Sequence, residues 1–128
     1  MSNSEILVNL NLERDPSCAR RARAVIAETF PQDPRCDSLE VIVSELVINA
    51  LEHGDGDIHL AVLRTNDTLR VEISNDTDQT ESELDLDIVG VPPAIDSERG
   101  RGLSLVKSFS NEIGYYLINS RLTVWAEL

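Results

Sequence analysis

A row of polar side chains on one predicted helix has the residue types and the spacing for chemistry. Glu45, Asn49 and Glu52 recur at i, i+4 and i+7 in the run ELVINALEHG, so they share one helix face flanked by apolar residues. Phosphoryl transfer needs a metal ligand and a group that takes the proton of an attacking hydroxyl. The neutral oxygen of Asn49 suits Mg²⁺, and the carboxylate of Glu45 suits the proton.

A glycine-rich segment follows about fifty residues later. In RGRGLSLV, Gly100 and Gly102 stand immediately before an apolar stripe, which predicts a loop that opens into a helix over about 102–111. Free N–H groups at a helix start bind anions such as phosphates, so the two segments together predict a nucleotide site. Taken alone, the first segment also fits a solvated helix face, and Arg101 also fits an ion pair with a neighbouring acid such as Asp96.

The composition narrows the class of protein. The chain has 128 residues, of which 41% are hydrophobic, and this size predicts a single domain over residues 1–128. Its net charge of −12 disfavours binding to nucleic acid or to an anionic membrane. The sequence shows neither a signal peptide nor an apolar run of about 20 residues, so we expect a cytoplasmic protein. Cys18 and Cys36 lack metal-ligand spacing and are expected to be reduced.

Hydrophobic periodicity predicts the order β, α, α, β, β, α, β, β. Asp15 is expected to cap the first helix, with Pro16 in its first turn, and Gly54 to stand just past the end of the second. The predicted elements are strands at 6–12, 58–64, 69–74, 114–119 and 122–128 and helices at 16–30, 35–53 and 102–111. The hairpins favour an α+β fold of two layers, with a mostly antiparallel mixed sheet packed against three helices.

A long acidic segment separates the predicted strand at 69–74 from the predicted helix at 102–111. Residues 76–98 include eight Asp or Glu and neither Lys nor Arg. Long loops in compact domains are commonly lids or binding loops, and this composition also fits a solvated linker. Carboxylates would repel a triphosphate unless the segment moves aside or a cation intervenes. We expect an acidic lid loop over about 76–98, with a short helical turn near 84–89.

The two motifs resemble those of a known family. ELVINALEHG is similar to the N box, and RGRGLSLV to the second glycine box, of the GHKL ATPase superfamily with its Bergerat ATP-binding fold. The short length, the run VEIS and the end TVWAEL resemble RsbW-like anti-sigma factor serine/threonine kinases, and the resemblance covers about residues 7–128. It implies that ATP is bound, that Glu45 is the catalytic base and that Asn49 is the Mg²⁺ ligand. The residues implied to hold the phosphates are Gly100, Arg101, Gly102 and Leu103.

The first glycine box departs from the family's pattern. That box usually carries an Asp that accepts the adenine amino group, followed by glycines, whereas this chain has no glycine over 75–79. Alignment from the preceding strand puts Asn75 at the Asp position, and a shift of one residue puts Asp76 there. An amide in place of the carboxylate is expected to weaken adenine binding by about 1–2 kcal/mol. His53, at a position common in this group, is expected to cap the helix C-terminus or to hydrogen bond in the core.

The resemblance implies an enzyme of a regulatory system. It predicts an anti-sigma factor that binds a sigma factor and uses ATP to phosphorylate a Ser or Thr of an anti-anti-sigma partner with a STAS domain. Such systems work by partner switching, and the family often forms homodimers. The alternative is a degenerate Bergerat-fold binding module that acts by protein contact without ATP turnover, which the glycine-free stretch 75–79 favours. A detached histidine kinase domain is disfavoured, because no helix with a phosphorylated histidine precedes residue 7.

Overall fold

The order of helices and strands follows the predicted pattern. The computed structural model describes residues 4–78 and 105–128. The elements in chain order are β1 (Ser4–Leu12), α1 (Cys18–Thr29), α2 (Cys36–His53), β2 (Asp55–Thr65), β3 (Thr68–Asp76), β4 (Glu112–Ile118) and β5 (Arg121–Glu127). A further helical segment covers residues 105–109 and ends two residues earlier than expected. The predicted α+β class is confirmed.

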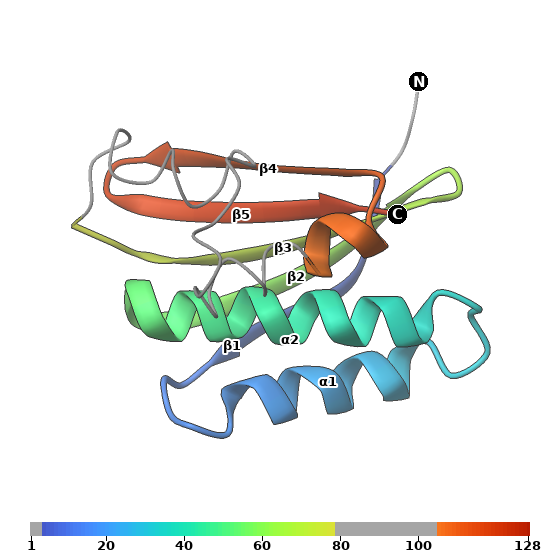
Figure 1. Ribbon diagram of the computed structural model, residues 1–128, viewed down its shortest axis with the longest axis horizontal. Helices are drawn as coiled ribbons and strands as arrows, with labels where there is room; N and C mark the ends of the chain where they lie inside the picture. The colour runs from blue at the N-terminus through green and yellow to red at the C-terminus, as the bar shows by residue number, and fades with distance from the viewer. Residues whose placement is uncertain (1–3, 79–104) are drawn as a thin grey trace.

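The five described strands form one sheet in the spatial order β1-β2-β3-β5-β4 (Figure 1). Each neighbouring pair is antiparallel, so the mostly antiparallel sheet that the hairpins predicted is confirmed. Asn66 turns the β2–β3 hairpin with a φ of 56°, a left-handed conformation that asparagine tolerates. Asn119 and Ser120 turn the β4–β5 hairpin, with φ of 52° and 64°.

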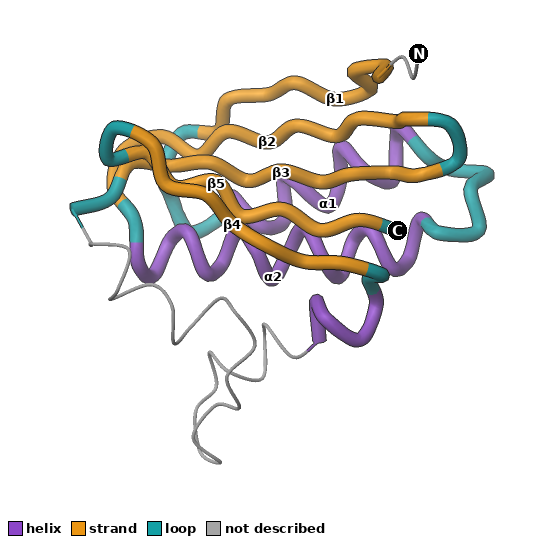
Figure 2. The backbone as a smooth tube through the Cα atoms, turned by 90° about the horizontal axis from the view of Figure 1, so that it is seen from above, coloured by secondary structure: helices purple, strands orange, loops and turns teal. Residues whose placement is uncertain are grey.

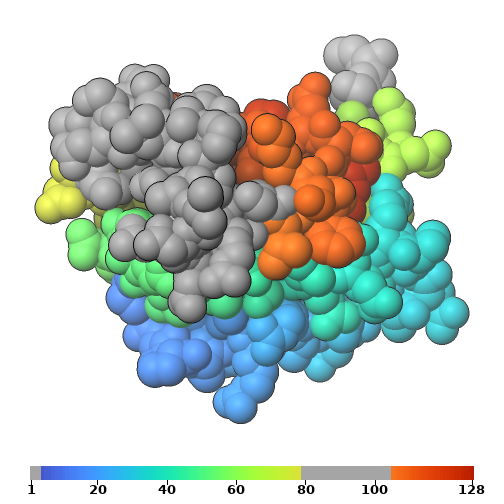
Figure 3. Space-filling view, in the orientation of Figure 1, coloured from blue at the N-terminus to red at the C-terminus, as the bar shows by residue number. Residues whose placement is uncertain are grey.

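Both long helices cover one face of the sheet (Figure 2). In this layer α2 lies between α1 and the helical segment 105–109, and Figure 3 shows its surface running between theirs. Burial of large apolar side chains, at about 1.5–3 kcal/mol each, holds the helices on the sheet. Fully buried examples are Ile26, Leu39, Ile42, Leu46, Ile58, Leu60, Leu69 and Ile73. None of the described helices has the length and apolar character needed to cross a bilayer.

The opposite face of the sheet carries a stacked group around Trp125. Every second residue of β5, starting at Leu122, faces the core, so Trp125 faces away from the helices. Its ring lies over Gly114 of β4, where a Cβ atom would come within 2.5 Å of the ring. The guanidinium of Arg70 lies over the ring, 4.2 Å from its centroid. Glycine at position 114 therefore makes room for the tryptophan.

The first helix begins later than the sequence predicts. Asp15 is not its N-cap and Pro16 is not in its first turn, because α1 begins at Cys18 with Ser17 as the N-cap. The Asp15 carboxylate instead accepts a hydrogen bond from the Ser17 N–H at 2.7 Å and pairs with Arg21 at 2.8 Å. A turn held by Asp15 thus replaces the predicted first turn of the helix.

The two cysteines are free, as the sequence predicts. Cys18 is buried, and its thiol donates to the Glu13 carbonyl oxygen at 2.7 Å. Burial raises the pKa of the Cys36 thiol, and the neighbouring Glu40 carboxylate raises it further. The Cys36 thiol therefore stays protonated, and poorly nucleophilic, at neutral pH.

An arginine fastens the N-terminal end of α2. Arg35, the residue before the helix, donates from Nη1 to the carbonyl oxygens of Asp67 at 2.6 Å and Leu128 at 3.4 Å. Its Nε atom lies 3.1 Å from Oδ1 of Asp33. Hydrogen bonding from the Arg35 side chain is the largest cause that lowers the pKa of the Asp33 carboxyl below its ordinary value of 3.8. Asp33 therefore favours the folded state while it is ionised.

We expect Asp33→Asn to lower stability at neutral pH, by an amount that shrinks in acid. The folded-state pKa of Asp33 lies below the unfolded value, so its contribution is present above the unfolded pKa and lost as the pH falls through the folded pKa. Thermal unfolding at pH steps from about 6 to about 3 measures this change. Glu28→Gln, which removes an exposed carboxylate from α1, is the control for net charge. A constant difference between the parent and Asp33→Asn at every pH would contradict the assignment.

Candidate functional site

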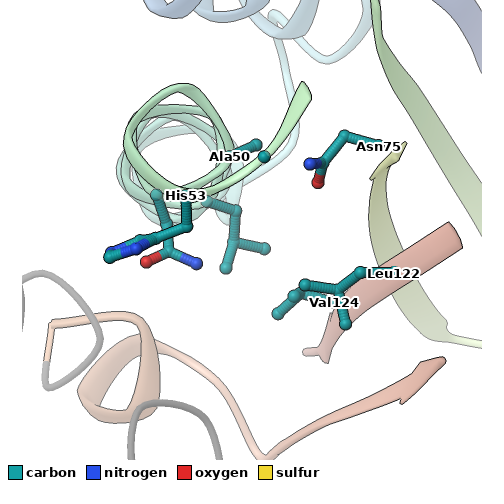
Figure 4. Close-up of a pocket in the computed structure, with 8 residues that line it drawn as sticks. Ala50, His53, Asn75, Leu122 and Val124 are labelled. Carbon is teal, nitrogen blue, oxygen red and sulfur yellow. The ribbon is translucent and has the colours of Figure 1, made fainter. Parts of the chain in front are cut away.

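A small pocket opens between the C-terminal half of α2 and the sheet (Figure 4). Aliphatic side chains form most of its wall, and two carboxamides and an imidazole are its polar groups. The lining residues are Leu46, Asn49, Ala50, His53, Gly54, Asn75, Leu122 and Val124. Apolar walls with a few polar groups are typical of sites for small organic ligands.

The polar row of α2 meets the pocket at one residue. Asn49 is half-buried and lines the pocket. Glu45 is half-buried one turn earlier on the same face and is not among the lining residues, and Glu52 is exposed. Helical phase explains this arrangement, because the buried stripe of α2 includes Leu46 and Ala50 and the row lies beside it. The helix therefore presents Asn49 to the pocket, with Glu45 next along the row.

His53 lies on the wall of the pocket. Its side chain is 14% exposed, and its Nε2 atom lies 3.8 Å from Oε2 of Glu52. The sequence predicts a role for His53 in capping the helix or in a core hydrogen bond. At this helix end the carbonyl oxygen of Ala50 accepts from the Gly54 N–H at 2.9 Å and from Nη2 of Arg14 at 3.1 Å. Gly54 and Arg14 thus cap the carbonyl oxygen of Ala50.

Asn75 is the polar residue that β3 contributes to the pocket. It is 3% exposed, and its Nδ2 atom donates a hydrogen bond to the carbonyl oxygen of Asp76 at 2.8 Å. Figure 4 shows the carboxamide directed at the end of α2, with its oxygen turned toward the pocket. Because Nδ2 makes this hydrogen bond, it points toward Asp76. The other end of the amide, Oδ1, is therefore presented to the pocket as an acceptor.

Asp76 faces away from the pocket. Its side chain is 65% exposed, and its Oδ1 atom lies 3.2 Å from Nη1 of Arg121. Alternation along β3 explains the difference, because every second residue from Leu69 to Asn75 is buried on the core side. Of the two alignments that the sequence allows, the structure brings Asn75 to the pocket and leaves Asp76 outside. The same alternation is visible in the sequence and is the signal that separates the two residues.

Position 54 requires a glycine because the Asn75 side chain approaches it closely. The structure confirms that Gly54 stands just past the end of α2, where it has φ −114° and ψ −178°, an extended conformation open to any residue. A Cβ atom would lie 1.3 Å from Nδ2 of Asn75 and 3.1 Å from the carbonyl oxygen of Ala50. The reason for the glycine is therefore steric, since a side chain would exclude the Asn75 amide from the helix end.

Arg14 supports the site and has no signal in the sequence patterns. It follows β1, in the connection to α1, where neither strand nor helix periodicity applies. Its guanidinium donates to the carbonyl oxygens of Leu51 at 2.9 Å, Ala50 at 3.1 Å and Gly56 at 2.9 Å. These contacts join residues more than thirty positions apart, so local sequence could not reveal them.

The second motif lies largely outside the described residues. The predicted phosphate-binding residues Gly100, Arg101, Gly102 and Leu103 fall there, as do most of the predicted lid and its short helical turn. Residues 105–109 continue the predicted helix, and Val106 is fully buried in the core. The lid was predicted to begin at residue 76, whereas β3 continues through Asp76.

Comparison with known proteins identifies the family. The model of the histidine kinase-like ATPase domain matches residues 8–127. The chain therefore belongs to the histidine kinase-like ATPase domain family, and the resemblance to the GHKL superfamily is confirmed. Membership in a family of ATPase domains implies nucleotide binding. No curated protein matches the chain by sequence.

Two solved structures share the fold. A chain of the SiaB–SiaC complex from Pseudomonas aeruginosa matches with a TM-score of 0.76 and 15% identity, over 96% of this chain and 89% of that chain. The catalytic domain of the histidine kinase ThkA matches with a TM-score of 0.57 and 14% identity, over 97% of this chain and 96% of that chain. At these identities the likeness concerns the fold, and it confirms the two-layer Bergerat sandwich.

We expect Gly54→Ala to lower the free energy of unfolding by about 1–3 kcal/mol, because the added methyl group overlaps the Asn75 amide. The same change should cost less in an Asn75→Ala background, where that amide is gone. Chemical unfolding of the parent, both single variants and the double variant gives a double-mutant cycle.

The control for this cycle is Gly114→Ala, which overlaps Trp125 on the other face of the sheet and should be additive with Asn75→Ala. An equal cost of Gly54→Ala in both backgrounds would show that Gly54 and Asn75 are not coupled.

Proposed function

We propose that the protein is an anti-sigma factor with ATP-dependent serine/threonine kinase activity. It would bind a sigma factor and phosphorylate a Ser or Thr of an anti-anti-sigma partner with a STAS domain. The observation that carries the nucleotide part is the meeting of Asn49 from α2 and Asn75 from β3 in one largely apolar pocket. The N box, the second glycine box and the family assignment support ATP as the nucleotide.

The residues of the pocket would offer an adenine base one hydrogen-bond acceptor and an apolar surface. Oδ1 of Asn75 would accept a hydrogen bond from the adenine amino group, as the family's aspartate does. Leu122 and Val124 supply aliphatic surface for a ring face. Adenine would thus be recognised by one directed acceptor within an apolar wall.

Asn49 would hold Mg²⁺ through its neutral side-chain oxygen. Within residues 4–78 and 105–128, no group of three or more His, Cys, Asp or Glu residues could bind a metal ion. Mg²⁺ bound with a nucleotide commonly takes one or two protein ligands and completes its shell with phosphate oxygens and water. A single carboxamide therefore fits this type of metal binding.

Glu45 would act as the general base. It lies one turn before Asn49, so its carboxylate shares a helix face with the amide that would bind the metal. Bound ATP supplies the γ-phosphoryl group, and ADP is the leaving group. Glu45 would take the proton from the Ser or Thr hydroxyl of the partner protein as the oxygen–phosphorus bond forms.

Partner switching would depend on the relative affinities of two complexes, one with the sigma factor and one with the antagonist. Binding of the unphosphorylated antagonist would release the sigma factor, and phosphorylation of the antagonist would restore inhibition, because each partner's affinity depends on the other's state. The fold similarity to a chain of the two-protein SiaB–SiaC complex supports a role in protein contact.

A binding module without ATP turnover is the second candidate. Asn75 stands where the family has aspartate, and no glycine follows over 75–79. A neutral amide gives adenine a weaker hydrogen bond than a carboxylate does. In this alternative the protein would act by contact with its partners alone.

Calorimetric titration with ATP, with and without Mg²⁺ and with ADP as a comparison, tests the nucleotide site. We expect Mg²⁺-dependent binding with a Kd in the micromolar range, about −8 kcal/mol. Asn49→Ala should abolish the Mg²⁺-dependent part of the affinity, because it removes the metal ligand. Asn9→Ala, which removes an exposed amide from β1, is the control. No binding up to millimolar ATP would favour the binding module.

Glu45→Ala should spare ATP binding and slow phosphoryl transfer by about 100-fold to 10,000-fold, the usual contribution of a general base. The measurement is transfer of labelled γ-phosphate to a STAS-domain protein, with ATP affinity measured on the same samples. Glu52→Ala, from the exposed end of the same row, is the matched control. Equal transfer by Glu45→Ala and the parent would rule out Glu45 as the base.

A further inference from the structure

We infer that Arg14 is a positioning residue for the recognition of the base. Its guanidinium fixes the backbone on both sides of Gly54 and so holds the surface against which the Asn75 amide is oriented. This inference rests on the proposed function, because it assumes that Asn75 reads a nucleotide base.

The contacts of Arg14 flank Gly54 in the chain. Two acceptors, Ala50 and Leu51, belong to the last turns of α2, and the third, Gly56, lies in the start of β2. Gly56 has a φ of 70°, and the pairing of β2 with β3 shifts register between Asp55 and His59, so the start of β2 is irregular here. One rigid guanidinium therefore joins the helix end to the strand start, with Gly54 held between them.

Arginine has both the charge and the shape for this role. The C-terminal end of a helix carries partial negative charge and unpaired carbonyl groups, and a cation nearby stabilises it. The planar guanidinium donates from Nε, Nη1 and Nη2 in fixed directions, and each of these atoms donates here to a different carbonyl. A lysine ammonium in the same place is a single point charge and could not hold all three in one geometry.

Gly54 bounds the space in which the Asn75 amide makes its hydrogen bond to Asp76. The Nδ2 atom of Asn75 lies directly over Gly54 and donates to the carbonyl oxygen of Asp76. If the backbone at Gly54 shifts, the amide gains room to break its hydrogen bond to Asp76, rotate and present Nδ2 to the pocket in place of Oδ1. The adenine amino group needs an acceptor at this point, whereas the guanine carbonyl needs a donor. Loss of the Arg14 contacts should therefore lower the preference for ATP over GTP.

Arg35 provides a matched control at the opposite end of the same helix. It also donates to backbone carbonyl oxygens distant in sequence, those of Asp67 and Leu128. It precedes the first residue of α2, whereas the pocket lies at the other end of the helix. Arg35→Ala should lower stability and leave the ATP/GTP preference unchanged.

The test compares the parent with Arg14→Ala, Arg14→Lys and Arg35→Ala by calorimetric titration with ATP and with GTP. For both Arg14 variants we expect ATP affinity to fall about tenfold, the equivalent of one hydrogen bond to the base, and the ATP/GTP ratio to fall with it. Arg14→Lys keeps the positive charge, and it provides the test if Arg14→Ala does not fold. An unchanged ATP/GTP ratio in a folded Arg14 variant overturns the inference.

A second measurement does not depend on nucleotide. The Asn75 side-chain amide signals of the free protein are identified in ¹H–¹⁵N spectra by their loss in Asn75→Asp. We expect these signals to shift in the Arg14 variants and to stay in place in Arg35→Ala. Unmoved signals in Arg14→Lys overturn the inference, whereas shifted signals in a protein that binds neither nucleotide support the positioning role and refute the proposed function instead.

Discussion

The contact between Gly54 and the Asn75 amide is the constraint on which the arrangement of the pocket depends. It brings the end of α2 against β3 without a side chain between them. The core sets up this approach, because buried residues of α2 and β3 hold the helix on the sheet along its length. The register of β3 then decides that Asn75, and not Asp76, reaches the helix. Helix packing and strand register together thus determine the position of the Asn75 amide.

The described lining of the pocket contains no carboxylate, although the protein is strongly acidic. The chain carries a net charge of −12, yet the side chains that α2 and β3 direct into the pocket are carboxamides, an imidazole and aliphatic groups. Asp76 and Glu52 are exposed, and the Asp76 carboxylate lies beside Arg121. A polyanionic ligand would therefore meet no carboxylate from α2 or β3 in this pocket, which avoids the repulsion that buried carboxylates would cause.

Periodic features of the fold could be predicted from the sequence, and single long-range contacts could not. The polar row of α2 and the apolar stripes gave the correct element order, because burial imposes their spacing over many residues. Asn75 follows the alternation of β3, so its inward direction was also predictable. Gly54 follows the last residue of α2 as predicted, but its close contact with Asn75 was not predictable, since Asn75 lies in another element. Arg14 was missed because its three acceptors belong to α2 and β2, far along the chain.

Trp125 has a consequence for spectroscopy of this protein. It is the single tryptophan of the chain, and its ring lies between Arg70 and Gly114 on the face of the sheet opposite the helices. Intrinsic fluorescence therefore reports the integrity of the paired strands β3, β4 and β5. A ligand in the pocket would contact Leu122 and Val124 on the other face, so a change in emission would signal a distortion transmitted through the sheet.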